Sequence, residues 1–497
     1  MIVKNEERYL AECLDSVKDI ADEIVIVDTG STDSTVAIAE KYNAKIILFP
    51  WCNDFSAARN EALRNSTGDY ILYLDADERV TKESKHVLKK IIQEKREVGY
   101  SCILRNRDEQ GGRPSMMRYV RLFANSPKIR FEGRVHEQIL NSLTKSNYRI
   151  EECNVELLHI GYDVPLTDLK KKAARNIELL LIDYEEAPSG YVAFQLGQSY
   201  AILENRAVAF RFFSEAVNYP NLLSDYSGIS YRYMAAELLQ QKKYKEALSS
   251  ISQALIKSEK QPLVQLIASK VYFALGEKSK AIEHAQMCYK YNLELLGGKI
   301  YGSYDMYIAP KELIYHFIEL AIEHNVQEMF NYAVTLLKNL PKNYQAGDDL
   351  EAVRLIVSEK PITKHDYPKI IALLNERTFS SFKLLFTSQR SSEEQEEFYE
   401  RCFEKIGENI EYLTSYANFE IAKENYPKAE SLIALGLKTN EYYLPLWLMS
   451  ISAGVAQGKM TEVMENITRA KGIFKNDFYS CGILENVEKK LNGYLNQ

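Results

Sequence analysis

Residues 23–28 read EIVIVD, residues 45–49 read KIILF, and residues 70–77 read YILYLDAD. Each run is short and rich in β-branched or large apolar residues, which is typical of strands buried in a parallel sheet. Residues 34–42 begin with a Ser suited to a helix cap, residues 55–65 carry apolar side chains on one side, and both are predicted helices. This alternation predicts an α/β domain with a Rossmann-like, doubly wound, mostly parallel sheet and right-handed crossovers.

Two carboxylates, Asp75 and Asp77, directly follow the third strand. Ligands of such sheets bind beyond the carboxyl ends of the strands, where acids at positions i and i+2 can both bind one Mg²⁺ or Mn²⁺ ion. The alternative is a pair of surface acids in a turn. Asp28 ends the first strand and Arg59 lies in the helix before the third, so a carboxylate, a cation and a metal site are expected at neighbouring strand ends. A nucleotide diphosphate needs this combination.

The pattern changes near residue 167, where strand-like runs give way to a helical repeat. Ala247 and Ala281 occupy equivalent small positions 34 residues apart, the period of tetratricopeptide repeats. The predicted segments are an α/β domain at 1–165, tetratricopeptide-like repeats at 166–297, degenerate repeats or an inserted helical subdomain at 298–405, and C-terminal repeats at 406–497. The charged run SSEEQEE at 391–397 is expected to be a solvated loop or a helix start.

The composition is that of a globular protein, with 46% hydrophobic and 26% charged residues. A formal charge of −7 disfavours general nucleic-acid binding, which needs a basic face. Seven scattered cysteines without a CxxC pair favour buried, reduced thiols of a cytoplasmic protein over disulfides or a zinc site. No apolar run reaches about 18 residues and none follows the N-terminus, so neither a transmembrane helix nor a signal peptide is expected.

The first 165 residues resemble family 2 glycosyltransferases of the GT-A fold. The segments that carry the resemblance, in the family's order, are MIVKNEE (1–7), EIVIVDTGSTDST (23–35), DFSAARNEAL (54–63) and GDYILYLDADE (68–78). Three later segments are similar to a subgroup fused to tetratricopeptide repeats: RLF (121–123), FEGRVHE (131–137) and HIGY (159–162). Glycosyltransferases that modify Cys of glycocin bacteriocin peptides share this layout.

The resemblance implies a site for a UDP-sugar and a divalent metal. The implied nucleotide-sugar contacts are Val3, Asn5, Glu6, Asp28, Arg59, Asp75 and Ala76. Residues 3–6 would flank the uracil, and Arg59 would lie near the base or the pyrophosphate. Asp77 would bind the metal directly, with Asp75 nearer the ribose or sugar. Because Met1 falls inside the family's first segment, the first strand is expected to be short or to begin upstream.

Glu137 is the candidate catalytic base, because inverting transfer needs a carboxylate to take the acceptor proton. The pair His136–Glu137 resembles the repeat-fused subgroup at this place, where the wider family has a Glu–Asp pair. The alternative is a structural acid paired with Arg134 or Arg130.

His159 follows the expected last strand, at 155–158. It is either a third metal ligand or diphosphate contact, or a structural histidine.

Five arginines form a basic cluster around the glycines at 111–112, which is either a mobile loop over the diphosphate or a solvated hairpin. They are Arg105, Arg107, Arg113, Arg118 and Arg121.

The expected function is metal-dependent, inverting transfer of a sugar from a UDP-sugar to a peptide or protein, at Ser, Thr or Cys. The repeats are expected to recognise the acceptor or to form a homodimer, because stacked helix pairs make extended concave surfaces. The alternatives are transfer to a cell-surface saccharide or lipid acceptor, and a repeat scaffold with an inactive transferase domain.

Overall fold

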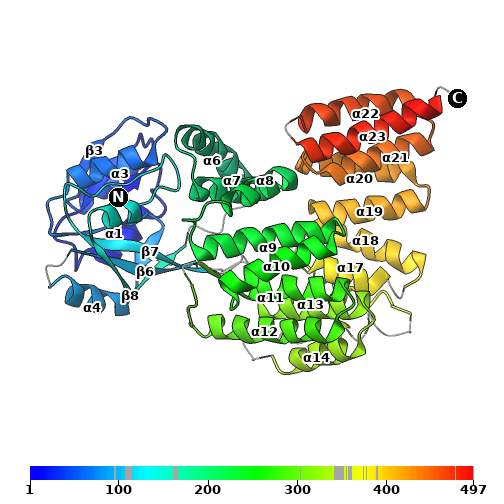
Figure 1. Cartoon of the computed structure of the whole chain (residues 1–497), viewed down its shortest axis with the longest axis horizontal. Helices are drawn as coiled ribbons and strands as arrows, with labels where there is room; N and C mark the ends of the chain where they lie inside the picture. The colour runs from blue at the N-terminus through cyan, green and yellow to red at the C-terminus, as the bar shows by residue number, and fades with distance from the viewer. Residues whose placement is uncertain are drawn as a thin grey trace.

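The protein is described from a computed structural model. The described residues are 1–93, 97–106, 115–160, 166–302, 304–340, 352–353, 355, 361–372, 374–375, 378–387, 390–475 and 477–495. An α/β domain occupies one end of the molecule and a curved array of helices occupies the other (Figure 1).

A parallel sheet lies at the start of the chain. Its order is β1 (Ile2–Val3), β2 (Val25–Asp28) and β3 (Lys45–Leu48), with β2 in the centre. Helices α1 (Leu10–Val17), α2 (Thr35–Lys41) and α3 (Phe55–Arg64) connect and cover these strands. The α/β class and the predicted helices at 34–42 and 55–65 are confirmed.

A second, mixed sheet has the order β4 (Tyr70–Leu72), β7 (Ser115–Ala124), β6 (Val98–Asn106), β8 (Arg149–His159) and β5 (Glu78–Val80). Only its β6–β8 pair is parallel. Helices α4 (Lys82–Ile91) and α5 (Leu140–Lys145) pack against β8 of this sheet.

The strand expected at 70–74 differs from the prediction. It ends at Leu72 and pairs antiparallel with β7 instead of joining the parallel sheet. Its apolar side chains pack into the core of the second sheet, and a short apolar run does not reveal which strand it will pair with.

The described chain after residue 165 forms helices, their connections and one short strand. Its helices are α6 (Leu166–Glu186), α7 (Gly190–Ile202), α8 (Arg206–Ala216), α9 (Ser224–Gln240), α10 (Tyr244–Ser258), α11 (Pro262–Ala274), α12 (Lys278–Leu296), α13 (Pro310–Glu323), α14 (Gln327–Lys338), α16 (Tyr367–Ala372), α17 (Phe379–Thr387), α18 (Ser392–Ile406), α19 (Ile410–Ala422), α20 (Tyr426–Thr439), α21 (Leu444–Ala456), α22 (Met460–Ile473) and α23 (Phe478–Leu495). Successive helices pack as antiparallel pairs, as in tetratricopeptide repeats.

Small residues bring the paired helices together. Ala247 and Ala281, which mark the repeat period in the sequence, are both fully buried. Gly197 packs directly against the ring of Phe213, where an added Cβ would lie 2.9 Å from a ring carbon. The run at 391–397 is a helix start: Ser391 and Glu394 form a capping box for α18.

The short strand within the helical region was not predicted. β9 (Tyr304–Met306) pairs antiparallel with residues 115–117 of β7 and so joins the helical region to the second sheet. Its sequence, Tyr-Asp-Met, is too short to carry a strand pattern.

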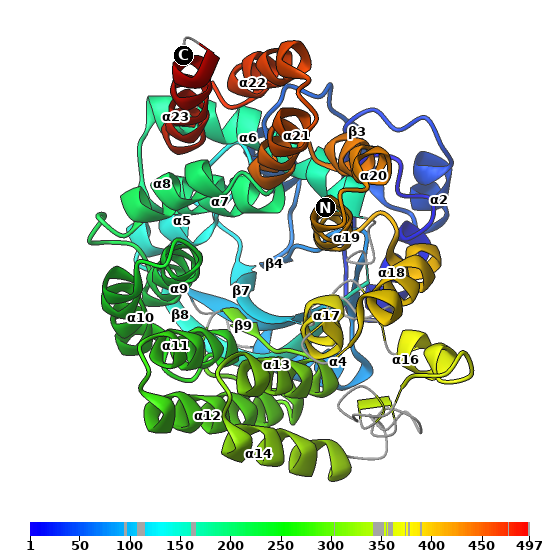
Figure 2. The same ribbon diagram turned by 90° about the vertical axis from the view of Figure 1, so that its right-hand side faces the viewer.

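The helical array curls until its last repeats meet its first. Asn440, after α20, hydrogen-bonds Glu204 between α7 and α8, and the guanidinium of Arg206 lies 6.0 Å from the ring centroid of Tyr443. In Figure 2 the helices surround an opening through which β4, β7 and β9 are seen. The helical region thus forms a curved array beside the second sheet, joined to it through β9.

All seven cysteines are free thiols, and five of them are buried as expected. Cys52 is exposed and Cys481 is partly exposed, so the expectation of burial is wrong for these two.

Candidate active site

A cavity of about 1670 Å³ lies between the two sheets and the first helices of the helical region. Eight of the predicted site residues line it: Val3, Glu6, Arg59, Asp75, Ala76, Asp77, Glu137 and His159. These residues come from segments as far apart as positions 3 and 159, and the fold brings them together at strand ends. Residues of α6, α7 and α9 form the opposite wall, including Arg175, Tyr191 and Tyr226.

Asn5 and Asp28 lie beside the cavity and do not line it. The buried carboxylate of Asp28 accepts hydrogen bonds from the backbone of Gly30 and Ser31 and from the Ser31 hydroxyl. Asn5, with φ of 58°, accepts from the backbone N–H of Thr32. Both side chains therefore shape the turn after β2.

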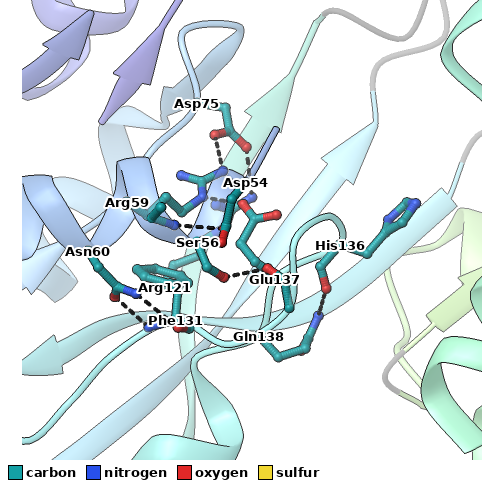
Figure 3. A network of polar contacts seen from close by, with 12 residues as sticks. Asp54, Ser56, Arg59, Asn60, Asp75, Arg121, Phe131, His136, Glu137 and Gln138 are labelled. Atoms are coloured by element: carbon teal, nitrogen blue, oxygen red, sulfur yellow. Dashed lines mark hydrogen bonds and ion pairs between the residues drawn. The ribbon is translucent and has the colours of Figure 1, made fainter. Parts of the chain in front are cut away.

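Helix α3 positions the segment FEGRVHE at 131–137. The Asp54 side chain caps the helix by accepting from the Ala57 N–H at 2.9 Å. Ser56 Oγ then donates to the Gly133 carbonyl at 2.5 Å, and the Asn60 amide both donates to and accepts from the Phe131 backbone. These contacts, drawn in Figure 3, hold Glu137 against the helix.

Arg59 joins the candidate base, Glu137, to Asp75, the first acid of the segment Asp75-Ala76-Asp77, which we call the DAD segment. Its Nε donates to Glu137, and a terminal nitrogen donates to Asp75 Oδ1 at 2.7 Å (Figure 3). Glu137 is thus paired with Arg59, and not with the two arginines considered from the sequence: Arg134 pairs with Asp183 and Glu186, and Arg130 with Glu132. Arg59 was expected near the nucleotide base or the pyrophosphate, and its guanidinium is ion-paired with two carboxylates.

A second buried arginine supports the same acid. Arg121 on β7 is ion-paired with Glu78 and lies 3.5 Å from Asp75 Oδ2. Burial opposes ionisation of Asp75, but Arg59 and Arg121 outweigh it and hold the pKa of Asp75 well below its usual range. Burial raises the pKa of Glu78 to about 7 in spite of Arg121. Of the two acids that share Arg121, Asp75 therefore holds its proton less tightly than Glu78.

The ring of Tyr73 lies beneath both guanidinium groups. Its centroid is 4.4 Å from the guanidinium carbon of Arg121 and 5.4 Å from that of Arg59. Cation–π attraction of this kind is worth about 0.5–2 kcal/mol, with the larger values at desolvated sites. Tyr73 thus fixes the two cations that orient Asp75.

Asp77 and His159 lie side by side, because β5 pairs with the end of β8. The Asp77 Oδ2 and His159 Nε2 atoms are 3.1 Å apart, and His159 Nδ1 lies 2.7 Å from the Asn106 Oδ1 atom. An amide oxygen accepts only from a protonated Nδ1, which in a neutral ring leaves the Nε2 lone pair facing the carboxylate. Burial alone would lower the pKa of His159, but the Asp77 hydrogen bond and the negative charges of Asp77, Glu78 and Asp75 together outweigh burial and raise it. The arrangement needs a cation, either a proton or a metal ion, between the two groups.

These donors fit a divalent metal bound together with its substrate. Carboxylate oxygen is a preferred ligand of Mn²⁺ and Mg²⁺, imidazole nitrogen is a ligand of transition-metal ions, and Asn106 is a partner that fixes the ring. In the described part of the chain, no three His, Cys, Asp or Glu side chains gather as a complete metal site. The other ligands would have to come from the diphosphate and water, as is usual for Mg²⁺ sites.

Glu6 is a further acid at the cavity wall. Burial first, and then the charges of Asp77 and Asp75, raise its pKa to about 7. The three carboxylates therefore repel one another, and a cation bound at Asp77 would relieve that repulsion.

The basic cluster is only partly described. Arg105 pairs with Glu156, and Arg118 donates to the backbone carbonyls of Ser101 and Cys153. Arg107 and Arg113 lie outside the described residues. Strands β6 and β7 pair antiparallel, and the segment between them, on which the two interpretations differ, lies outside the described residues. Of the three described arginines, only Arg121 reaches the acids Asp75 and Asp77.

Sequence reasoning missed several residues that the fold adds to the site. They are Tyr73, Glu78, Asn106, Arg175, Tyr191 and Tyr226. Glu78 directly follows the DAD motif and could have been noted from that position. Asn106, Tyr191 and Tyr226 carry no local signal, because only the pairing of distant elements brings them to the cavity.

Comparison with known proteins identifies the family of the first domain. Residues 1–148 match the family described as Glycosyl transferase family 2. The chain is 37% identical over 206 residues to a tetratricopeptide repeat-containing protein of Synechococcus elongatus, covering 40% of this chain and 50% of that protein. It is 29% identical over 222 residues to the SPbeta prophage-derived glycosyltransferase SunS of Bacillus subtilis, covering 44% of this chain and 52% of SunS. The crystal structure of S. aureus TarS aligns with a TM-score of 0.30 and 17% identity, over 48% of this chain and 52% of that one.

The matched stretches span about half the length of the two curated relatives. No helix in the described ranges is long and apolar enough to cross a membrane. The DAD acids, the α3 segment and the parallel sheet all fall within the matched residues. The chain therefore begins with a glycosyltransferase family 2 domain at residues 1–148, followed by helix pairs of the tetratricopeptide type.

Proposed function

We propose that the protein is a metal-dependent, inverting glycosyltransferase that moves a sugar from a UDP-sugar to a peptide or protein acceptor. One observation carries the proposal: Asp75, Asp77, His159 and Glu137 line a single cavity, with Glu137 tied to Asp75 through Arg59. The proposed donor-side acid and the candidate base thus share one arginine, and the proposed metal ligands line the same cavity.

The donor site is proposed at the ends of β1 and β4. Val3, Glu6 and Ala76 line the cavity there, and the turn shaped by Asn5 and Asp28 lies beside it. Asp77 and His159 would hold the metal, and a bound divalent cation would neutralise charge that builds up on the leaving diphosphate. Asp75, held by two arginines, would be oriented toward the ribose or sugar.

Glu137 is the proposed general base. Its carboxylate would take the proton of the acceptor hydroxyl or thiol as that atom bonds to the anomeric carbon. The bond between the anomeric carbon and the diphosphate oxygen breaks in the same step, and UDP leaves with the bonding electron pair. Attack from the face opposite the diphosphate inverts the anomeric centre, so an α-linked donor gives a β-glycoside.

The helical region is proposed to recognise the acceptor. It forms the cavity wall opposite the donor site, through α6, α7 and α9. A homodimer through the outer helices is compatible with this role. The proposed setting is the cytoplasm, where the free thiols would stay reduced.

The proposal is tested by donor turnover. Purified protein is incubated with a panel of UDP-sugars, with Mn²⁺ or Mg²⁺ and with a chelator, and release of UDP is measured. We expect at least one donor to be hydrolysed slowly in the presence of metal and not with the chelator. A chain that binds and turns over no UDP-sugar under any of these conditions would be a scaffold with an inactive domain.

The metal assignment is tested by Asp75→Ala and Asp77→Ala. Each change should abolish metal-dependent turnover, whereas Asp69→Ala, in the same segment but outside the cavity lining, should have little effect. Near-normal metal-dependent activity in either DAD variant would refute the assignment.

A further inference from the structure

One edge of strand β7 is paired at both ends and open in the middle. β9 pairs with residues 115–117, and β4 pairs with residues 122–124. Between them the Arg121 carbonyl accepts from the Tyr73 N–H at 3.1 Å. Residues 118–120 pair with β6 on their other side, and no strand in the described chain pairs with them on this one. We refer to residues 118–120 as the open edge.

The open edge lies on the wall of the active-site cavity. Residues 117–121 all line it, together with Asp75 and Glu137. The next residue along the strand, Arg121, lies 3.5 Å from Asp75. Backbone N–H and C=O groups of an edge strand are a template for an added strand. Here that template lies beside the proposed site of transfer.

Four tyrosines from four elements cover the region beside the open edge. They are Tyr119 on β7, Tyr191 on α7, Tyr226 on α9 and Tyr304 on β9. The ring centroids of Tyr191 and Tyr226 are 5.5 Å apart. Burial, followed by the nearby Tyr226, Tyr191 and Tyr304, raises the pKa of Tyr119 well above its usual value. We call these residues the tyrosine cluster.

The tyrosine cluster reaches the candidate base. The Tyr191 hydroxyl accepts a hydrogen bond from Gln138 Nε2 at 2.7 Å, and Gln138 directly follows Glu137. A segment lying along the open edge would therefore have the tyrosine cluster at its side and Glu137 close to it. Two of these tyrosines belong to α7 and α9, so the helical region supplies part of the wall.

The charge of the cavity restricts what can bind. Nine acidic and five basic residues line it. Three of the basic residues, Arg59, Arg118 and Arg121, already bind carboxylates or backbone carbonyls. A polyanionic acceptor, such as a phosphate-linked polymer, would find few available cations here. A neutral or basic acceptor suits the cavity better.

We propose that the acceptor is a neutral or basic peptide segment that binds as an extended strand along the open edge, with alternate side chains packed on the tyrosine cluster. The inference rests on the proposed transferase function and specifies its acceptor. The added strand would continue the sheet between β9 and β4, with main-chain hydrogen bonds giving affinity and the tyrosines giving side-chain selectivity. A saccharide lacks the regularly spaced N–H and C=O groups that this edge can pair.

A backbone scan of the acceptor tests the pairing directly. A synthetic library of capped heptapeptides with central Ser, Thr or Cys is incubated with the protein, metal and the accepted UDP-sugar, and products are identified by mass spectrometry. The best substrate is then remade with one N-methyl group at each position in turn. We expect transfer to fall about tenfold or more at one or two alternate positions, those opposite residues 118–120, and little elsewhere, because a strand presents every second N–H to its neighbour.

Other outcomes of the scan overturn the inference. Equal tolerance of N-methyl groups at every position would exclude strand pairing. Modification of uncharged oligosaccharides, with none of the library peptides modified, would exclude a peptide acceptor while leaving glycosyl transfer intact. If the proposed glycosyltransferase function itself is wrong, the result differs: no UDP-sugar is hydrolysed, with or without an acceptor.

A pair of tyrosine variants tests the cluster. Tyr226→Ala should raise the acceptor peptide KM about tenfold and leave the donor KM nearly unchanged. Tyr479→Ala, at a tyrosine of α23 that is 52% exposed and far from the cavity lining, is the matched control and should change neither. Equal acceptor KM values in both variants would remove the tyrosine cluster from the proposal. The N-methyl scan leaves the protein unaltered and decides the pairing even if Tyr226→Ala folds poorly.

Discussion

Arg59 is ion-paired with Glu137, 78 residues away in the chain, and with Asp75 through another nitrogen of the same guanidinium. The arginine and Glu137 have side chains that are 10% and 11% exposed, whereas Asp75 is 36% exposed. One planar cation therefore sets the separation of the candidate base and the donor-side acid. A lysine could not reproduce this, because its ammonium is a point charge without the planar fork.

The first prediction concerns stability. Arg59→Met should leave Glu137 without its cation and Asp75 with Arg121 alone. The free energy of unfolding should fall by about 3 kcal/mol, the low end for a broken buried pair, because Asp75 keeps one partner. Arg64→Met, on the same helix, removes an exposed ion pair with Glu61 and should cost less than about 1 kcal/mol. Urea unfolding of both variants measures the difference.

The stability difference between the wild type and Arg59→Met should depend on pH. The pKa of Asp75 is lowered in the folded protein, so its contribution to stability is present above the unfolded pKa and lost as the pH falls. The difference in the free energy of unfolding between the wild type and Arg59→Met should therefore become smaller below about pH 4. A difference that grows in acid would contradict the ion pair.

The second prediction concerns the base. Glu137→Gln keeps the shape and can still accept from Arg59, so donor binding should be unchanged within about twofold. Loss of the proton acceptor should reduce transfer by about 10²–10⁴-fold. Glu132→Gln, in the same segment and bonded to Lys145, is the matched control. Calorimetric titration with UDP and a transfer assay separate the two effects, and undiminished transfer in Glu137→Gln would refute its role.

Much of the site could be predicted because its residues sit at positions that local patterns mark. Asp75 and Asp77 follow an apolar run, and Glu137 lies in a segment that resembles the family. These signals identify residues without giving their partners. The pairing of Glu137 with Arg59, instead of Arg134, depends on how Ser56 and Asn60 dock the 131–137 segment onto α3.

The parts that could not be predicted depend on long-range pairing. The run at 70–74 was correctly expected to be a strand, but its antiparallel partner lies some fifty residues later, in β7. β9 has only three residues, and its strand conformation comes from β7 and not from its own composition. Asn106 reaches His159 only because β6 and β8 run parallel in a register that places them opposite one another.

The third prediction concerns metal binding and pH. The pKa of His159 is raised, and the protonated ring cannot bind a metal, so each metal ion bound below that pKa must displace a proton. Mn²⁺ affinity should increase about tenfold per pH unit below the His159 pKa and level off above it. Calorimetry in buffers of different ionisation enthalpy measures the proton release.

A histidine pair provides the control for this prediction. His159→Gln should weaken Mn²⁺ binding and flatten its pH dependence. His316→Gln, on α13 beside Glu319 and outside the cavity lining, should leave both unchanged. Identical pH dependence in the two variants would place the titrating group elsewhere.

The fourth prediction isolates the partner of His159. Asn106→Leu removes the amide that fixes the ring without touching a proposed ligand. Loss of such a partner typically weakens metal binding by about 10–100-fold. Asn106→Asp retains an oxygen acceptor and should recover part of that affinity. Mn²⁺ titrations followed by electron paramagnetic resonance would show whether Mn²⁺ affinity falls in the order wild type, Asn106→Asp, Asn106→Leu.

The last prediction concerns the helix pairs that build the cavity wall. At Gly197 an added Cβ would lie 2.9–3.0 Å from three carbons of the Phe213 ring, which is only 2% exposed and cannot move aside easily. Gly197→Ala should therefore lower the free energy of unfolding by about 1–3 kcal/mol, the usual cost of overpacking. Gly472, in α22, has open space around the same position, and Gly472→Ala should instead stabilise by about 0.5–1 kcal/mol through better helix propensity. If the two changes shift the melting temperature in opposite directions, position 197 requires glycine for close approach of the helices and not for flexibility. Stabilisation by both changes would contradict the packing of α7 against α8.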